Sequence, residues 1–332
     1  MITDTREKIL SIIRNRGQAR VSDLARELGL STVAIHKQLK RLLTSSLIEK
    51  RGVPPVVYYV PKIQIQKLSF VSPIPDDIQD VIEKTYLAIT PDGHMLEGVE
   101  GFAYWAGIYG KDKNIEDLAQ NYADAIAKQK ESLSLGSWLD ATSKLQTTFP
   151  DSSIKRLLFS EVYSIPVFGR TKLAKLVMHA KTSQDGSLIH MIADLVKPTI
   201  DLIIKTHHIQ AVGYIPPTVP RPMQFMAEFA RDINLHLPVI ELSKVMPGTV
   251  AVPQKSLTST GDRVINARES IYPKKTDMLP YKHILLIDDV AGSGASFNET
   301  ARKLVPLLPP DVQITAYAIV GNIKGYEVIR QI

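Results

Sequence analysis

The chain contains no cysteine, which excludes disulfides, thiolate zinc sites and cysteine nucleophiles. It also has no apolar run approaching the roughly 20 residues of a membrane-spanning helix, and its charged N-terminus shows no signal-peptide pattern. We therefore expect a cytoplasmic protein. The length of 332 residues and a hydrophobic content of 44% predict a folded protein of two or three domains.

Positive charge is concentrated at one end of the chain. Residues 1–62 contain 12 Lys and Arg against 5 Asp and Glu, whereas the rest of the chain contains 28 against 29. A small basic unit within an otherwise neutral chain is typical of a nucleic-acid-binding module. We therefore predict a domain boundary near residue 62.

The basic segment has the pattern of three helices followed by two strands. Apolar spacing predicts helices over residues 4–16, 21–28 and 31–43, and Ser31 is a favoured cap for the third. Residues 47–52 and 56–60 have the composition of two strands joined by a Gly-Pro tip. This order resembles the winged helix-turn-helix of bacterial repressors.

The resemblance implies that the third helix enters the DNA major groove while the hairpin contacts phosphates. The side chains expected to face DNA are Thr32, Val33, His36, Lys37 and Lys40 on the helix, with Lys50 and Arg51 on the wing. The alternative is a winged helix that serves only protein contacts or dimerisation. The local charge favours nucleic acid, and we expect DNA as the partner of a possible homodimer.

Residues 63–150 carry no recognisable chemical motif. Helical spacing over 76–89 and 115–130 surrounds an aromatic cluster between Gly98 and Gly110. Such a cluster is more often hydrophobic core than binding site. We predict a small helical middle domain of unassigned function.

The strongest chemical signal lies in residues 283–296. Ile284 to Ile287 form an uninterrupted apolar run, typical of a strand buried on both faces of a parallel sheet. Two carboxylates, Asp288 and Asp289, follow, and then a loop of small residues leads into a helix. Glycines let the backbone approach a phosphate, and the first N–H groups of the helix bind an anion. The expected phosphate-binding residues are Val290, Ala291, Gly292, Ser293, Gly294, Ala295 and Ser296.

This arrangement resembles the phosphoribosyl-pyrophosphate (PRPP) signature of type I phosphoribosyltransferases, with Gly292 and Ser293 in place of two common threonines. The resemblance implies an α/β domain with a parallel sheet over residues 151–332. It also implies that Asp288 and Asp289 hold the ribose hydroxyls, directly or through Mg²⁺. The alternative is an ordinary buried strand whose terminal acids are merely solvated.

Further segments are similar to the competence-associated ComF group of phosphoribosyltransferase-like proteins, over about 170 residues. The matching stretches are 173–182, 188–196, 211–216, Pro253 to Leu257 and Asp262 to Ala267. Two features depart from that group. The chain lacks the four-cysteine zinc ribbon, and the basic Arg-Gly-Phe-Asn-Gln segment is reduced to Pro220–Phe225.

The resemblance implies that Arg221, Lys255 and Arg263 neutralise the pyrophosphate of PRPP, with catalysis by orientation and electrostatics. For Arg263 a structural role in its loop is equally consistent with the sequence. The reduced basic segment weakens the case for turnover but not for phosphate binding.

Three functions fit these patterns. The first is phosphoribosyl transfer to an unknown acceptor with release of pyrophosphate, guided by a DNA-binding winged helix. The second is a DNA-binding transcriptional regulator whose phosphoribosyltransferase-like domain only senses PRPP or nucleotides, since one fold serves many functions. The third is an effector in a bacterial defence system of the retron type.

Overall fold

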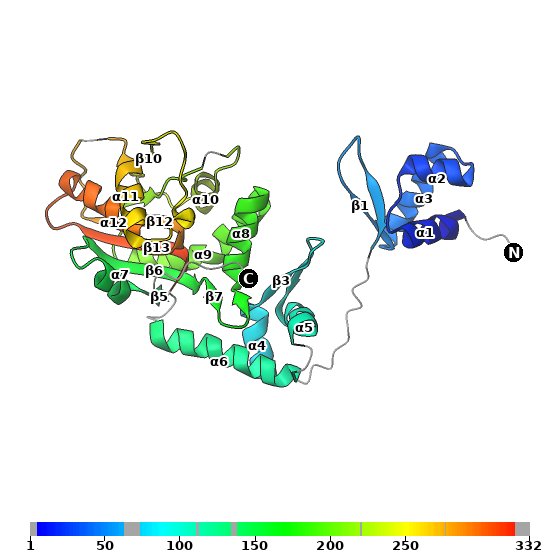
Figure 1. The fold of residues 1–332 in the computed structure, drawn as a ribbon, viewed down its shortest axis with the longest axis horizontal. Coiled ribbons are helices and arrows are strands. Elements are labelled where there is room, and N and C mark those ends of the chain that lie inside the picture. Colours follow the sequence, from blue (N-terminus) through cyan, green and yellow to red (C-terminus); the bar gives the residue numbers. More distant parts are fainter. Residues whose placement is uncertain are drawn as a thin grey trace. The chain divides into compact units, whose positions relative to one another are not determined.

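The computed structural model describes residues 5–62, 74–110, 113–133, 138–219, 221–275 and 277–322, apart from the side chains of 130–133 and Lys255. The chain forms two compact units, Met1–Pro73 and Ile74–Ile332 (Figure 1). None of the helices in the described ranges has the length and apolar character that crossing a membrane requires.

The first unit contains three helices and a hairpin. The helices are α1 (Thr5–Arg16), α2 (Val21–Leu28) and α3 (Thr32–Thr44), and the antiparallel strands are β1 (Ile48–Arg51) and β2 (Tyr58–Pro61). The Ser31 hydroxyl accepts a hydrogen bond from the Ala34 N–H at 3.2 Å, which caps α3 as the sequence predicts. Gly29 adopts a φ of 63° at the end of α2, which sets the sharp turn into α3. The unit has its own core of fully buried side chains: Ile9, Ile13, Leu24, Ile35, Leu39 and Leu42.

The second unit is built on a mixed five-stranded sheet of order β5-β6-β13-β12-β9. Four strands are parallel: β6 (Ile154–Val162), β13 (Gln313–Gly321), β12 (His283–Ala291) and β9 (Ala211–Tyr214). The edge strand β5 (Leu139–Asp140) runs antiparallel to β6. The remaining described strands of this unit form three short antiparallel pairs outside this sheet: β3 (Leu87–Ile89) with β4 (Met95–Glu97), β7 (Ser164–Ile165) with β8 (Gly169–Arg170), and β10 (Leu242–Lys244) with β11 (Ile271–Pro273).

Helices cover both faces of the sheet, which explains the apolar run in β12. Ile284 and Leu286 belong to one hydrophobic core, and Leu285 and Ile287 belong to another. The second core is covered by α8 (Lys172–Ser183), α9 (Gly186–Thr206) and α10 (Phe225–Ile233). The first core is covered by α4 (Asp76–Thr85), α5 (Gly98–Tyr109), α6 (Ile115–Leu133), α7 (Thr142–Thr148), α11 (Thr260–Ser270) and α12 (Ala295–Leu304). Short 3₁₀ turns occupy Gln254–Ser256 and Val305–Leu307.

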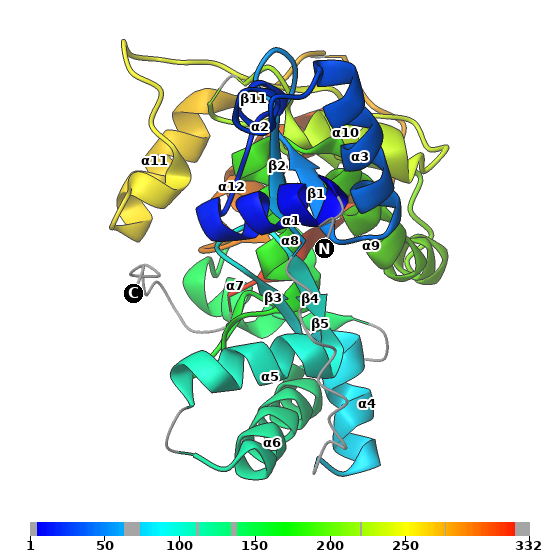
Figure 2. The ribbon, with the colours of Figure 1, turned by 90° about the vertical axis from the view of Figure 1, so that its right-hand side faces the viewer.

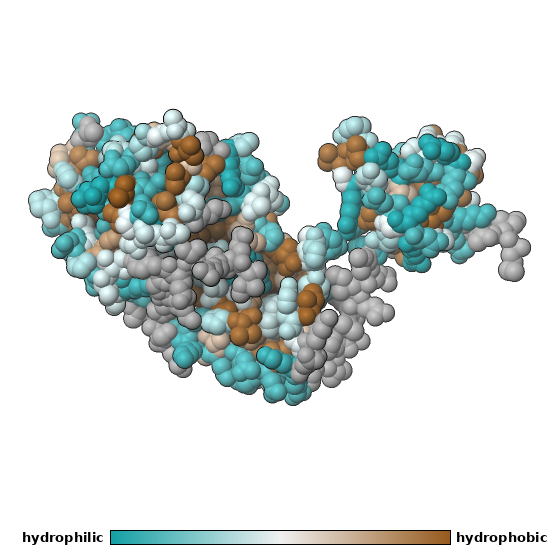
Figure 3. Space-filling model, in the orientation of Figure 1, coloured by the Kyte–Doolittle hydropathy of each residue, from teal (hydrophilic) through white to brown (hydrophobic). Residues whose placement is uncertain are grey.

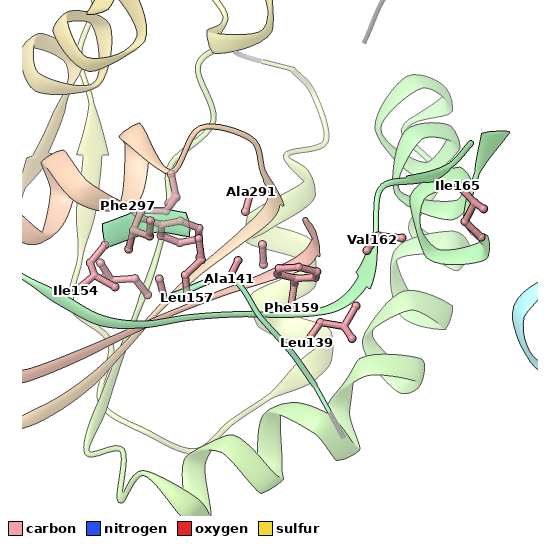
Figure 4. Close-up of a cluster of buried hydrophobic side chains, with 14 of the residues drawn as sticks. Leu139, Ala141, Ile154, Leu157, Phe159, Val162, Ile165, Ala291 and Phe297 are labelled. Carbon is pink, nitrogen blue, oxygen red and sulfur yellow. The ribbon is translucent and has the colours of Figure 1, made fainter. Parts of the chain in front are cut away.

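Residues 74–149 share this core instead of forming the separate helical domain expected over 63–150. Side chains of β5, β6, β12 and α12 pack together around Phe159 (Figure 4). The helices α4, α5 and α6 lie together in both ribbon views (Figure 2). Aromatic rings of α5 and α6 pack against Phe168 of the β7–β8 turn, whose ring centroid lies 5.1 Å from those of Trp105 and Tyr122. The predicted middle domain is therefore part of the sheet unit, because its apolar side chains are buried against residues that come later in the chain as well as against one another.

Candidate functional site

The predicted phosphate segment lies at the carboxyl end of β12. The strand continues through both acidic residues to Ala291, since Asp288 and Val290 pair with Ala318 and Val320 of β13. We expected the strand to end before the acids, and this boundary was wrong. Ligands of open α/β sheets commonly bind at the carboxyl ends of the strands.

The loop between β12 and α12 is short and geometrically constrained. Gly294 has a φ of 79°, a left-handed conformation that favours glycine. A Cβ at Gly294 would also lie 2.6 Å from Leu145 Cδ1. The Ser293 hydroxyl accepts a hydrogen bond from the Ala295 N–H at 3.3 Å, and α12 begins at Ala295, so Ser296 is in its first turn. The loop therefore leads directly into a helix N-terminus, where the first N–H groups lack intrahelical acceptors.

The two acids occupy different environments. Side chains alternate along a strand, so neighbours point to opposite faces of the sheet. Asp289 is 9% exposed, and its backbone N–H donates to Asp288 Oδ1 at 2.8 Å. Burial, and secondarily the charge of Asp289, raises the pKa of Asp288 above its ordinary value. The pair is thus held at an electrostatic cost that its neighbours partly offset.

Two lysines that the sequence analysis did not assign to the site supply positive charge to the acidic pair. Lys181, in the last turn of α8, donates to Asp289 Oδ2 at 2.5 Å. Lys244 of β10 lowers the pKa of Asp288 by its charge and donates to Thr218 Oγ1 at 2.6 Å. Lys181 falls within a stretch that resembles ComF-like proteins, which was the only available signal for it.

Arg221, predicted to neutralise pyrophosphate, reaches the same region. Its guanidinium donates to the backbone carbonyl of Lys181. This contact links the loop before α10 to the end of α8. Arg221 is therefore linked to Asp289 through Lys181.

Arg263 also lies beside the loop. Its Nη1 is 3.9 Å from the position of a Cβ built on Gly292, while its Nε and Nη2 donate to the Leu257 carbonyl at 3.0 and 2.8 Å. Gln254 Nε2 donates to the Arg263 carbonyl and to Asn266 Oδ1. The segments 253–257 and 262–267 therefore contact each other. The side chain of Lys255 lies outside the described residues.

Residues expected in the middle domain form another wall of the site. Lys144 and Thr148 of α7 line a small pocket with Gly292, Ser293 and Asn322. Lys144 Nζ donates to the Asn322 carbonyl at 3.0 Å, and burial lowers the pKa of this amine. The β12–α12 loop thus has α7 on one side and Arg263 on another.

The resemblance implies Mg²⁺ at Asp288 and Asp289, and the arrangement of donors does not fit it. Mg²⁺ requires a near-octahedral set of oxygen ligands. One oxygen of Asp289 is taken by the Lys181 ammonium, and one oxygen of Asp288 accepts a backbone N–H. Within the described ranges, no group of three or more His, Asp or Glu side chains converges as a metal site.

The first unit carries a second candidate surface, for nucleic acid. The side chains of Thr32, Val33, His36, Lys37 and Lys40 are all exposed along α3, and Lys50 is exposed on β1. Arg51 instead pairs with Glu49 at 2.6 Å and is half-buried. The hairpin tip is apolar, since Val53 is 76% exposed and Val56 is also exposed, and apolar surface is visible there (Figure 3).

The hairpin is attached firmly to the helical part. Ala19 and Tyr59 exchange two backbone hydrogen bonds of 2.9 and 2.8 Å. The Arg20 guanidinium donates to the Tyr58 hydroxyl at 2.6 Å and lies 4.6 Å from the centroid of that ring. The wing therefore has a defined orientation relative to α3.

The model of the MarR family matches residues 2–53, which cover the three helices and β1. The N-terminal unit is thus similar to that family and has the helices and hairpin of a winged helix-turn-helix. No curated protein matches the chain. The resemblance of the sheet unit to ComF-like phosphoribosyltransferases stays a prediction.

Proposed function

We propose that this protein is a DNA-binding transcriptional regulator whose sheet domain binds a phosphorylated ribose, such as PRPP, as its signal. The observation that carries the proposal is the MarR-like match over residues 2–53, on a unit whose exposed recognition face is basic. Exposed cations on such a helix bind phosphates and base edges. We therefore propose a regulatory function ahead of an enzymatic one.

The signal is inferred from the second unit. An acidic strand end and a short glycine loop into α12 match the needs of a ribose phosphate, in which hydroxyl groups donate to carboxylates and a phosphate binds N–H groups. Lys181, Lys244 and Arg221 add positive charge around that position. A ligand with several negative charges suits this set better than an uncharged sugar.

The test measures coupling between the two sites. Duplexes are selected from a randomised DNA pool with the full chain, and their affinity is measured by fluorescence anisotropy with and without millimolar PRPP. Allosteric coupling would change the DNA affinity by about 5-fold or more. The Asp288→Asn/Asp289→Asn double variant should bind the same DNA but no longer respond to PRPP. Unchanged affinity for wild type would overturn the sensing role.

Phosphoribosyl transfer is the second candidate, and the approach of Arg263 to Gly292 favours it. In this reaction an acceptor nitrogen bonds to the anomeric carbon as pyrophosphate leaves, and a guanidinium stabilises the leaving group. Pyrophosphate release from PRPP in the presence of purine or pyrimidine bases distinguishes the enzyme from the sensor. Release that Arg263→Gln abolishes would establish turnover.

A further inference from the structure

The cation beside the acidic pair is a side chain of the protein itself. Lys181 Nζ lies 2.5 Å from Asp289 Oδ2, and the Asp289 side chain is 12% exposed. The lysine side chain is 40% exposed, so its ammonium spans the space between a buried carboxylate and solvent. A ligand that approaches Asp289 from solvent therefore meets this ammonium.

Two features hold the ammonium in place. Lys181 is in the last turn of α8, where the helix dipole favours a positive charge. Its backbone carbonyl accepts a hydrogen bond from Arg221, which fixes that turn. The lysine is therefore positioned by contacts on both its side chain and its main chain.

The charges around the pair leave little need for a metal. Asp289 carries one negative charge and Asp288, whose pKa burial raises, carries at most one more, whereas Lys181, Lys244 and Arg221 carry three positive charges. Mg²⁺ would add two more positive charges and would compete with the Lys181 ammonium for Asp289. A lysine ammonium has three N–H donors, so donation to Asp289 leaves two for the oxygens of a ligand.

We propose that Lys181 replaces the divalent cation of this site, so that the protein binds phosphorylated ribose without Mg²⁺. The inference rests on the proposed sensing function and adds the mode of recognition. In it, Lys181 neutralises the ligand's negative charge and holds Asp289 in place.

The experiment compares binding in EDTA with binding in excess MgCl₂, by calorimetry on the full chain. The ligands are PRPP and ribose 5-phosphate, and the variants are Lys181→Met and Lys172→Met. Lys172 is a matched control, because it is on the same helix and forms a comparable ion pair with Glu97 at 2.9 Å. Circular dichroism confirms that each variant is folded.

Wild type and Lys172→Met should bind with affinities in EDTA and in MgCl₂ that agree within about twofold. In EDTA, Lys181→Met should bind the ligands with an affinity about tenfold or more below that of wild type. In MgCl₂ it should regain part of this affinity, because the metal ion enters the position that the ammonium occupied. Mn²⁺ provides a separate readout, since electron paramagnetic resonance should detect its binding to Lys181→Met and not to wild type.

The outcomes separate the two ideas. Wild-type binding that requires MgCl₂, or equal Mn²⁺ binding by wild type and Lys181→Met, would overturn the role of Lys181 and leave the sensing function standing. Failure of wild type to bind either ligand in both buffers would overturn the sensing function, and the inference with it.

Discussion

Lys181 and Asp289 are separated by 108 residues in the chain, yet their charged groups meet at 2.5 Å. The contact joins the end of α8 to the end of β12. Because α8 covers the sheet face toward which Asp289 points, a residue at the carboxyl end of that helix can reach the carboxyl end of the strand. The fold thus assembles the site from a helix and a strand that no local motif connects.

Asp288→Asn should stabilise the protein at neutral pH. The pKa of Asp288 is raised in the folded state, so the folded protein holds a proton that the unfolded chain releases as the pH rises above 4. The stability that Asp288 contributes to the folded protein is therefore fully present below the pKa of the unfolded chain. It is lost as the pH rises through the raised pKa of the folded state. Asparagine avoids the cost and should add about 1 kcal/mol of stability at pH 7 to 8.

Thermal melts between pH 4.5 and pH 8 test this expectation. Asp201→Asn is the control, since Asp201 is exposed on α9. The gain from Asp288→Asn should shrink toward pH 4.5, where the wild-type carboxyl is protonated in the folded protein. A gain that is equal at both ends of the pH range would contradict the argument.

Gly294 and Gly292 should respond differently to alanine, although they are two residues apart. Gly294→Ala combines a left-handed backbone with a Cβ placed 2.6 Å from Leu145, so it should cost about 2 kcal/mol or more. At Gly292 the nearest atom to a new Cβ is 3.9 Å away, and φ is not in the left-handed region. Urea unfolding of the two variants should show a large loss for the first and less than about 0.5 kcal/mol for the second. Equally small losses of stability for the two variants would mean that Leu145 moves aside and that the turn tolerates alanine at Gly294.

Local chemistry was sufficient to predict part of this structure. Ser31 caps α3, and the apolar run Ile284–Ile287 is a strand buried on both faces, because short-range rules govern both. The end of β12 was wrong because pairing with β13 holds the acidic residues in the sheet. That pairing depends on a partner segment about 30 residues further on, which no local pattern reveals.

The middle of the chain shows a different limit. Helical spacing identified α4 and α6, but it extended the first helix to residue 89, which belongs to β3, and it did not reveal the surface against which the helices pack. Their aromatic residues contact Phe168, which belongs to a later hairpin, and this contact merges the predicted domain with the sheet unit. The Lys181–Asp289 pair was missed for the same reason, since sequence reasoning finds contacts within an element more readily than contacts between elements.

Tyr86→Phe should be neutral or stabilising. The Tyr86 hydroxyl is buried and has no hydrogen-bond partner among the described residues, and burial raises its pKa. Its removal relieves a desolvation cost of about 1 kcal/mol, and phenylalanine keeps the ring beneath the Lys175 ammonium, 4.6 Å from its centroid. Tyr317→Phe is the matched comparison. It removes a 2.6 Å hydrogen bond with Ser160 and should cost about 1 kcal/mol. Melting temperatures that fall for Tyr86→Phe would indicate that its hydroxyl has a partner in solution.

Lys37→Ala and Lys40→Ala should weaken DNA binding and reduce its dependence on salt. Each lysine that contacts a phosphate releases about one counterion, so each variant should lower the slope of log affinity against log salt concentration by about 0.9. Lys8→Ala is the control, because Lys8 is exposed on α1 of the same unit but lies outside the α3 face. The slopes are measured by fluorescence anisotropy on duplexes selected by the full chain. If all three variants lower the slope equally, DNA binds to the basic unit without preference for α3. If none of the variants lowers the slope, α3 does not bind DNA through these lysines. Its exposed face would then serve protein contacts, and the proposed DNA-binding role of α3 would be wrong.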